Sequence, residues 1–116
     1  MNKHPPLPEA DLMRPIQAHA MSMFKDSIDA FAREDVDLAR GGVGRDNELD
    51  KLNKLASRRL TQRMAEDPEQ LRGYLNLIFI SRCLERVGDH ATNIAEDAVY
   101  AAAAEDIRHQ SMVGSS

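Results

Sequence analysis

Tryptophan is absent from this chain of 116 residues, and its aromatic side chains amount to two tyrosines and three phenylalanines. A sheet that depends on aromatic and β-branched residues is therefore not expected. Alanine, leucine, methionine, arginine and glutamate are plentiful, and all of them favour helix. The single cysteine, Cys83, excludes an intrachain disulfide, and its place on the apolar side of a predicted helix indicates a buried packing thiol.

Long apolar runs and an excess of basic residues are also missing. Because neither a segment of membrane-spanning length nor a charged-then-apolar signal segment is present, we expect a soluble, cytoplasmic protein with no direct membrane insertion. Lysine and arginine number 15 against 19 aspartates and glutamates, so the net charge is −4, with both signs interspersed. This pattern supplies no basic stripe, and we expect neither nucleic acid nor an anionic membrane surface as a partner.

Length and composition predict one all-α domain, a three-helix up-down-up bundle over residues 11–109. Residues 1–10 contain three prolines and are expected to form a flexible N-terminal arm. Residues 110–116 have no apolar periodicity, which predicts a disordered tail.

Apolar residues at three- and four-residue steps predict a first helix that begins at about Asp11 or Pro15 and ends near Arg33. Asp35 can then cap a second helix. The following stretch contains Gly41, Gly42 and Gly44. Because each glycine costs about 1 kcal/mol relative to alanine inside a helix, these residues alone predict a helix end at this point.

A helical pattern resumes after the glycines and continues to about Glu66. Asp67 as N-cap, Pro68 at the first helical position and Gln70 at the third then form a helix start signal. The third helix is expected to reach about Ala104.

An acidic stripe lies in the middle of this third helix. Four oxygen-bearing side chains fall within about 60° of one another on the helical wheel, with Asn93 just outside: Glu85, Asp89, Thr92 and Glu96. Apolar residues gather on the opposite side, so the stripe is expected to face outward. Asp46 and Asp50 form a second pair with i, i+4 spacing in the preceding helix, where they lie with Asn53 away from the apolar side. Antiparallel packing would let the two acidic sets meet.

Two interpretations of the stripe remain open. Carboxylates opposite an apolar face are most often a solvated surface. However, Glu85 and Asp89 repel each other at i, i+4 when no cation lies between them. Carboxylate and amide oxygens are ligands of hard cations, which favours magnesium, manganese, calcium or iron over a thiolate-type zinc site.

Residues 84–97, LERVGDHATNIAED, resemble the signature of the PhoU family of phosphate-uptake regulators, whose repeats carry an LERxGDHAxNIAE pattern with an embedded ExxxD metal motif. Weaker similarity extends from about Met21 to His109. The resemblance implies a metal-binding role for six residues: Asp46, Asp50, Glu85, Asp89, Asn93 and Glu96. The ions implied are iron, zinc, manganese or magnesium, with the identity left open.

The resemblance also implies partners and a topology. PhoU-like proteins help to repress the phosphate-starvation response by contacting the ATPase subunit of the phosphate ABC transporter and a sensor histidine kinase. The matching repeat runs one continuous helix through the stretch that holds the glycines here. Relatives usually carry two such repeats, whereas this chain accounts for one, as a natural single repeat or as a piece of a longer protein. A homodimer would cover the apolar surface that a second repeat otherwise covers.

Catalysis is not expected. Carboxylate-bridged di-iron bundles use Glu-x-x-His motifs, and no histidine of this chain has a glutamate three residues before it. The glycine stretch lacks the lysine of a phosphate-binding loop. The sequence thus favours a non-enzymatic regulator of phosphate uptake and signalling. The alternative is a metal-binding or storage bundle without signalling partners.

Overall fold

The computed structural model describes residues 7–114, which form helices and no β-strand. Three long helices are present, α1 (Met13–Arg33), α3 (Asp46–Glu66) and α4 (Leu71–Gly114). A short helix, α2 (Val36–Gly42), follows α1, and the 3₁₀ turns η1 (Pro8–Leu12) and η2 (Pro68–Gln70) precede α1 and α4. The predicted all-α class is confirmed.

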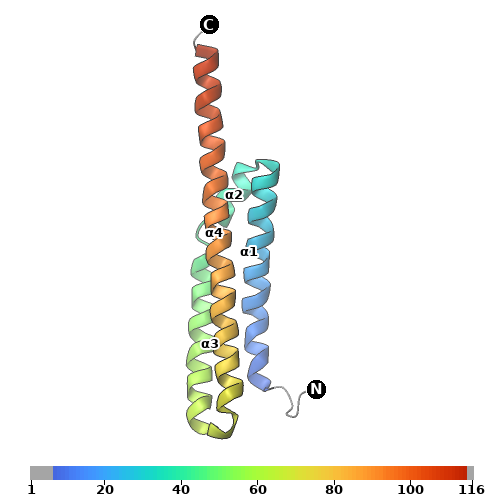
Figure 1. Cartoon of the computed structure of the whole chain (residues 1–116), viewed down its shortest axis with the longest axis vertical. Helices are drawn as coiled ribbons and strands as arrows, with labels where there is room; N and C mark the ends of the chain where they lie inside the picture. Colours follow the sequence, from blue (N-terminus) through green and yellow to red (C-terminus); the bar gives the residue numbers. More distant parts are fainter. Residues whose placement is uncertain (1–6, 115–116) are drawn as a thin grey trace.

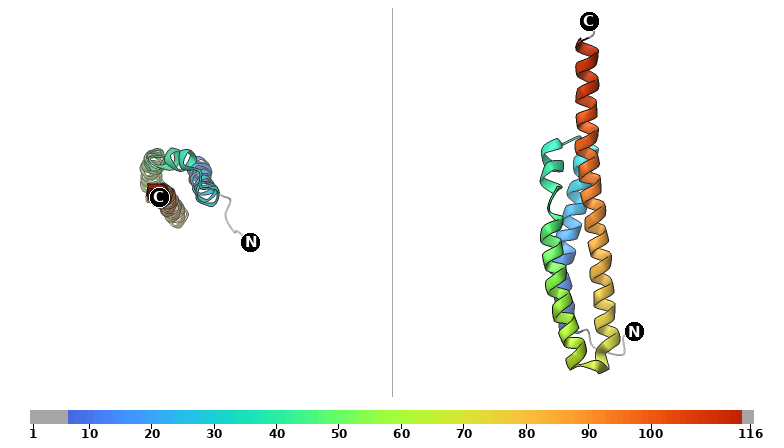
Figure 2. Two further views of the ribbon diagram at one scale, coloured as in Figure 1. Left: turned by 90° about the horizontal axis from the view of Figure 1, so that it is seen from above. Right: turned by 90° about the vertical axis from the view of Figure 1, so that its left-hand side faces the viewer.

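Figure 1 shows the chain running along α1, returning through α2 and α3, and then running along α4 in the direction of α1. Contacts that pair early residues of one segment with late residues of the other make α2 and α3 antiparallel to α4: Gly42 with Ala95, Leu49 with Gly88, and Asn53 with Ser81. α4 packs along both α1 and α3, and Figure 2 shows α3 and α4 side by side.

The core lies along the lines where α1, α3 and α4 meet. Its side chains recur at three- and four-residue steps on each helix, which is the spacing of one helical face. The fully buried large side chains are Ile16 and Met23 of α1, Leu49 and Leu60 of α3, and Tyr74 of α4. A smaller alanine cluster, formed by Ala30, Ala39 and Ala98, closes the end where α1 turns into α2.

The helix after Asp35 is interrupted at Val43–Arg45. Asp35 caps α2 by accepting a hydrogen bond from the Leu38 backbone N–H at 3.1 Å. α2 ends at Gly42, and Gly44 has a φ of 94°, a backbone conformation that residues with a Cβ rarely adopt. The helix end expected from the glycines themselves is therefore confirmed, and the continuous helix implied by the family resemblance is wrong for this chain.

The N-terminal segment is more ordered than the predicted flexible arm over residues 1–10. Residues 1–6 lie outside the described part of the chain, but Pro8–Leu12 form η1. The buried Glu9 accepts a hydrogen bond from Arg63 Nε at 2.9 Å, across the bundle. This ion pair, together with Leu7 against Gly73, holds the segment on the end of α3 and α4.

The last helix is longer than predicted. α4 continues to Gly114 rather than ending near Ala104, so residues 110–114 are helical, whereas 115–116 lie outside the description. Alanine is the strongest helix former, and the run Ala101–Ala104 carries the helix beyond the end of the bundle, where no proline interrupts it. No helix in the described range is both long and apolar enough to cross a bilayer.

Candidate functional site

The carboxylates of the acidic stripe of α4 face solvent, as the wheel predicts, whereas the Thr92 hydroxyl of that stripe is buried. Small residues on another face of the helix, at Gly88, Ala91 and Ala95, are buried against the other helices. The four predicted ligands of this helix are all exposed: Glu85, Asp89, Asn93 and Glu96. None of these four takes part in an ion pair among the described residues.

The acidic pair of α3 lies at the beginning of that helix. Asp46 is in the first turn, where a carboxylate interacts favourably with the helix dipole. Asp50 lies one turn later and forms an ion pair with Lys54, with 3.0 Å between Oδ2 and Nζ. Both residues are half-buried.

Asp50 and Glu85 line one groove between α3 and α4. The groove has a volume of about 210 Å³. Two basic side chains, Lys54 and Arg82, share it with the two carboxylates. The remaining lining residues are Asn53, Ser57, Leu60, Ile78 and Ser81.

A buried polar pair links the two helices beside this groove. The Ser81 hydroxyl donates to Asn53 Oδ1 at 2.6 Å, and the Asn53 side chain is only 6% exposed. The Asn53 amide nitrogen has no hydrogen-bond partner in the described structure. A buried donor without a partner costs about 1–3 kcal/mol. The unpaired amide of Asn53 therefore lowers the stability of the fold next to the acidic side chains.

The other predicted ligands do not join this groove. Asp46, Asp89, Asn93 and Glu96 are absent from its lining. Within the described residues, no three histidine, cysteine, aspartate or glutamate side chains are grouped so that they could hold a metal ion. In donor chemistry Asp50 and Glu85 fit a hard divalent cation, which would compete with Lys54 for Asp50.

Comparison of the sequence with protein families shows to which family this chain is related. A family model described as "PhoU domain" matches residues 14–98. The chain belongs to the PhoU family. The resemblance of residues 84–97 to its signature is thereby confirmed.

Three curated relatives of this PhoU-family chain carry the name "Phosphate-specific transport system accessory protein PhoU", and the two Pseudomonas proteins carry it as homologs. The Pseudomonas aeruginosa protein is 42% identical over 97 residues, which cover 84% of this chain and 40% of the relative. The Pseudomonas putida protein is 40% identical over 100 residues, which cover 86% of this chain and 39% of the relative. The Serratia marcescens protein is 36% identical over 91 residues, covering 78% and 37%. The chain therefore spans about two fifths of the length of these relatives.

The residues of the PhoU signature lie on two faces of α4 in this chain, one exposed and one buried. The signature's carboxylates face solvent, whereas Gly88 packs against Leu49 of α3, Ala95 packs against Gly42 of α2, and Ala91 lies in the core cluster. All six predicted ligands lie within the matched residues 14–98. The helical wheel did not predict the burial of Asn53, because it places Asn53 with Asp46 and Asp50, away from the apolar side of the helix. Its spacing of four from Leu49 and three from Ala56, both buried, is the signal that points to the core.

Proposed function

We propose that the described helices form one PhoU-like repeat, an up-down-up three-helix bundle that acts in the cytoplasm as a non-enzymatic regulator of phosphate uptake. The observation that supports this most directly is the PhoU-domain match over residues 14–98, together with relatives named as accessory proteins of phosphate-specific transport. By this proposal the chain joins the phosphate transporter ATPase subunit to a sensor histidine kinase.

Retention of partners from lysate tests the adaptor role. Immobilised protein is exposed to lysate of phosphate-replete cells that encode it, and retained proteins are identified by mass spectrometry. We expect both the transporter ATPase subunit and the sensor kinase to be retained. If neither is retained while the immobilised chain keeps its helical circular dichroism, the adaptor proposal fails. The metal-binding or storage bundle then becomes the better description.

We propose further that the acidic side chains bind a divalent metal ion. Asp50 and Glu85 face one groove from α3 and α4, and Asp46, Asp89, Asn93 and Glu96 supply further oxygen donors on the same two helices. Oxygen donors of this kind suit iron, manganese or magnesium, and carboxylates also bind zinc. The ion would offset the repulsion between Glu85 and Asp89, which lie one helical turn apart.

Elemental analysis of purified protein tests the metal proposal. We expect about one or more ions per chain in the wild type and none in the double variant Glu85→Gln, Asp89→Asn. A matched control, Glu48→Gln with Glu69→Gln, removes the same charge from exposed positions elsewhere and should keep the metal. All three proteins should give the same helical circular dichroism. Equal metal content in the two double variants would contradict the metal proposal and would mean that the stripe is only a solvated surface.

Thermal stability provides an independent measurement of the same site. A ligand present at 100 times its dissociation constant stabilises the folded state by about 2.7 kcal/mol. We therefore expect a chelator to lower the melting temperature of the wild type and to leave that of Glu85→Gln, Asp89→Asn unchanged. A wild-type melting temperature that is indifferent to chelator would contradict the proposal.

We also propose that the chain self-associates. Its outer face between α1 and α4 carries apolar side chains, including the exposed Ile28 and Phe31 of α1 and the half-buried Ile94 of α4. An exposed apolar face of this kind is typical of an interaction surface. A twofold homodimer would bury the same patch on both copies.

A further inference from the structure

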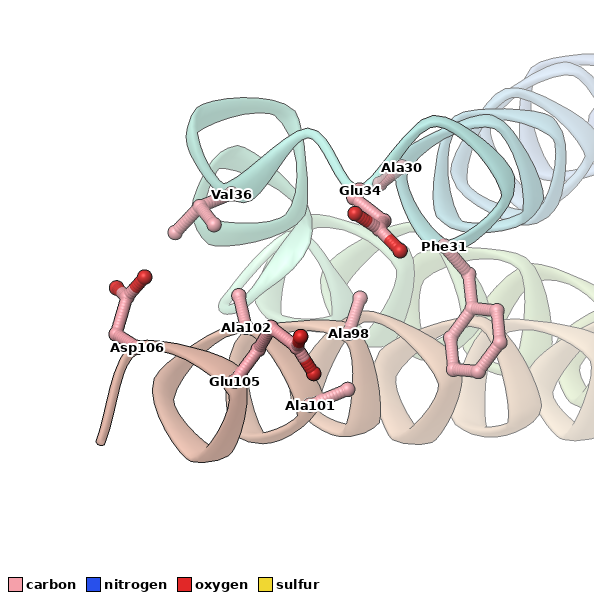
Figure 3. A pocket seen from close by; sticks show the side chains of 9 residues that line it. All are labelled: Ala30, Phe31, Glu34, Val36, Ala98, Ala101, Ala102, Glu105 and Asp106. Atoms are coloured by element: carbon pink, nitrogen blue, oxygen red, sulfur yellow. The ribbon is translucent and has the colours of Figure 1, made fainter. Parts of the chain in front are cut away.

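A second cavity lies at the corner where α1 turns into α2, over the last part of α4 that the bundle covers (Figure 3). Its volume is about 310 Å³, at the lower end of the range for ligand pockets. α1 contributes Ala30 and Phe31, the α1–α2 connection contributes Glu34, and α2 contributes Val36. α4 contributes Ala98, Ala101, Ala102, Glu105 and Asp106.

The floor of this cavity is apolar. Three alanines of α4, Ala98, Ala101 and Ala102, leave room next to the end of α1 because their side chains are single methyl groups. Phe31 stands beside them with 53% of its surface exposed. The cavity thus has an aliphatic floor with an aromatic side chain at its edge.

The polar groups of this cavity are all acidic. Figure 3 shows the Glu34 and Glu105 carboxylates facing the space between α1 and α4, with Asp106 across from Val36. None of the nine lining residues is basic. Glu105 pairs with Arg108, whereas Glu34 and Asp106 form no ion pair within the described structure.

Glu34 occupies a backbone conformation that usually selects glycine. Its φ is 54° and its ψ is 39°, in the left-handed region, and it ends α1 with its N–H directed to the Ala30 and Phe31 carbonyls. For a residue with a Cβ this conformation costs about 1–2 kcal/mol. A glycine would adopt this conformation without that cost.

We infer that this cavity receives an arginine side chain from a basic segment of a partner protein. The aliphatic stem of arginine matches the alanine floor. Its guanidinium can form charge-assisted hydrogen bonds with one of the two unpaired carboxylates of the cavity, Glu34 or Asp106. A small metal ion matches the cavity less well, because it needs several oxygen ligands at one point, whereas Figure 3 shows Glu34 and Asp106 toward different ends of the cavity. The inference does not depend on the metal groove, and Ala101–Asp106 lie beyond the residues that match the PhoU domain.

Alanine methyl groups report directly on occupancy. The full chain, labelled with ¹³C on alanine methyls, is titrated with acetyl-tetraarginine amide. We expect shifts at Ala98, Ala101 and Ala102, which line the cavity, and none at Ala103 and Ala104, which are exposed and lie outside it. Acetyl-tetracitrulline amide has nearly the same shape without the charge and should give no shifts.

Three variants distinguish binding of tetraarginine in the cavity from its general attraction to an acidic protein. Glu34→Gln with Asp106→Asn should weaken tetraarginine binding by about tenfold or more, because both carboxylates that can pair with an arginine lose their charge. Glu34→Gly should also weaken it while raising the melting temperature, so a failure to fold cannot explain the loss. Asp37→Asn removes an exposed carboxylate outside the cavity and should leave binding unchanged. Equal losses in Asp37→Asn, or shifts spread evenly over all alanine methyls, would overturn the inference.

Discussion

At the end of the bundle where α3 turns into α4, the buried Tyr74 is held by polar residues from three segments. Its hydroxyl donates to Asp67 Oδ2 at 3.2 Å, and Arg63 lies 6.0 Å from its ring centroid. Arg63 in turn donates to Glu9 and Glu66. Asp67 was expected to cap the next helix, but its side chain makes no capping hydrogen bond. The nearby phenol provides its partner instead.

Replacing Tyr74 by phenylalanine tests this arrangement. Tyr74→Phe keeps the buried ring and loses one hydrogen bond, so we expect the free energy of unfolding in urea to fall by about 1 kcal/mol at neutral pH. Tyr100→Phe is the control, because Tyr100 is 79% exposed and its change should lie within about 0.5 kcal/mol of the wild type. A loss as large in Tyr100→Phe would show that the Tyr74 hydrogen bond is not the cause.

The same phenol makes stability depend on alkaline pH. Burial raises the pKa of Tyr74 above its usual value of 10.0, because the charged phenolate is poorly solvated there. The folded state therefore favours the neutral form. This contribution to stability is complete below the ordinary tyrosine pKa and is lost as pH rises through the raised pKa. Above about pH 10, wild-type stability should fall more steeply than that of Tyr74→Phe in urea titrations.

Among the helices, the contact between α3 and α4 depends on a glycine within the PhoU signature. A Cβ at Gly88 would overlap the Leu49 side chain, which is itself buried. Gly88→Ala gains about 1 kcal/mol of helix propensity but overpacks a filled core at a cost of about 1–3 kcal/mol. We expect a net loss of stability, measured as a lower melting temperature by circular dichroism.

Gly41→Ala is the matched substitution at an open position. No atom lies within 4 Å of a Cβ built at Gly41, which is in the exposed part of α2. The substitution should therefore raise the melting temperature, since the helix gains propensity without a clash. If both substitutions stabilise the protein, close packing at Gly88 is not what keeps α3 and α4 together.

For the whole molecule, the apolar groove between α1 and α4 predicts assembly. The groove has a volume of about 420 Å³ and is lined by Ile28, Phe31, Ala32, Ile94 and Asp97. We expect light scattering coupled to size exclusion at micromolar concentration to give about 26 kDa, twice the chain mass of 13.0 kDa. A single mass near 13.0 kDa that does not change on concentration would contradict the proposed dimer.

One substitution in the groove should separate the chains. Ile28→Asp places a charge on a side chain that is 45% exposed in the single chain, so we expect a monomer with unchanged helical circular dichroism. Leu55→Asp is the control, because Leu55 is 62% exposed on α3 and does not line the groove. If Leu55→Asp also gave a monomer, the effect of Ile28→Asp would not be specific to the groove, and the contact between the two chains would lie elsewhere.

Local pattern predicted the helices well and the contacts between them less well. The end of α1 at Arg33, the Asp35 cap and the restart at Pro68 agree with the structure, since each depends on residues a few positions apart. Asn53 was assigned to the polar side of its helix and is buried. Its burial follows from the position of Ser81, which is distant in sequence.

By itself, the sequence determined the helical class, the break at Gly44 and the outward direction of the α4 stripe, because hydrogen bonds and side-chain faces within a helix depend on residues within about one turn. Only the tertiary structure decided which side chains meet across helices. It brought Asp50 and Glu85 to one groove but not the other four predicted ligands. It also placed Glu34 over the alanines of α4. Such pairings follow from the register in which small residues, such as Gly88 against Leu49, let two helices approach.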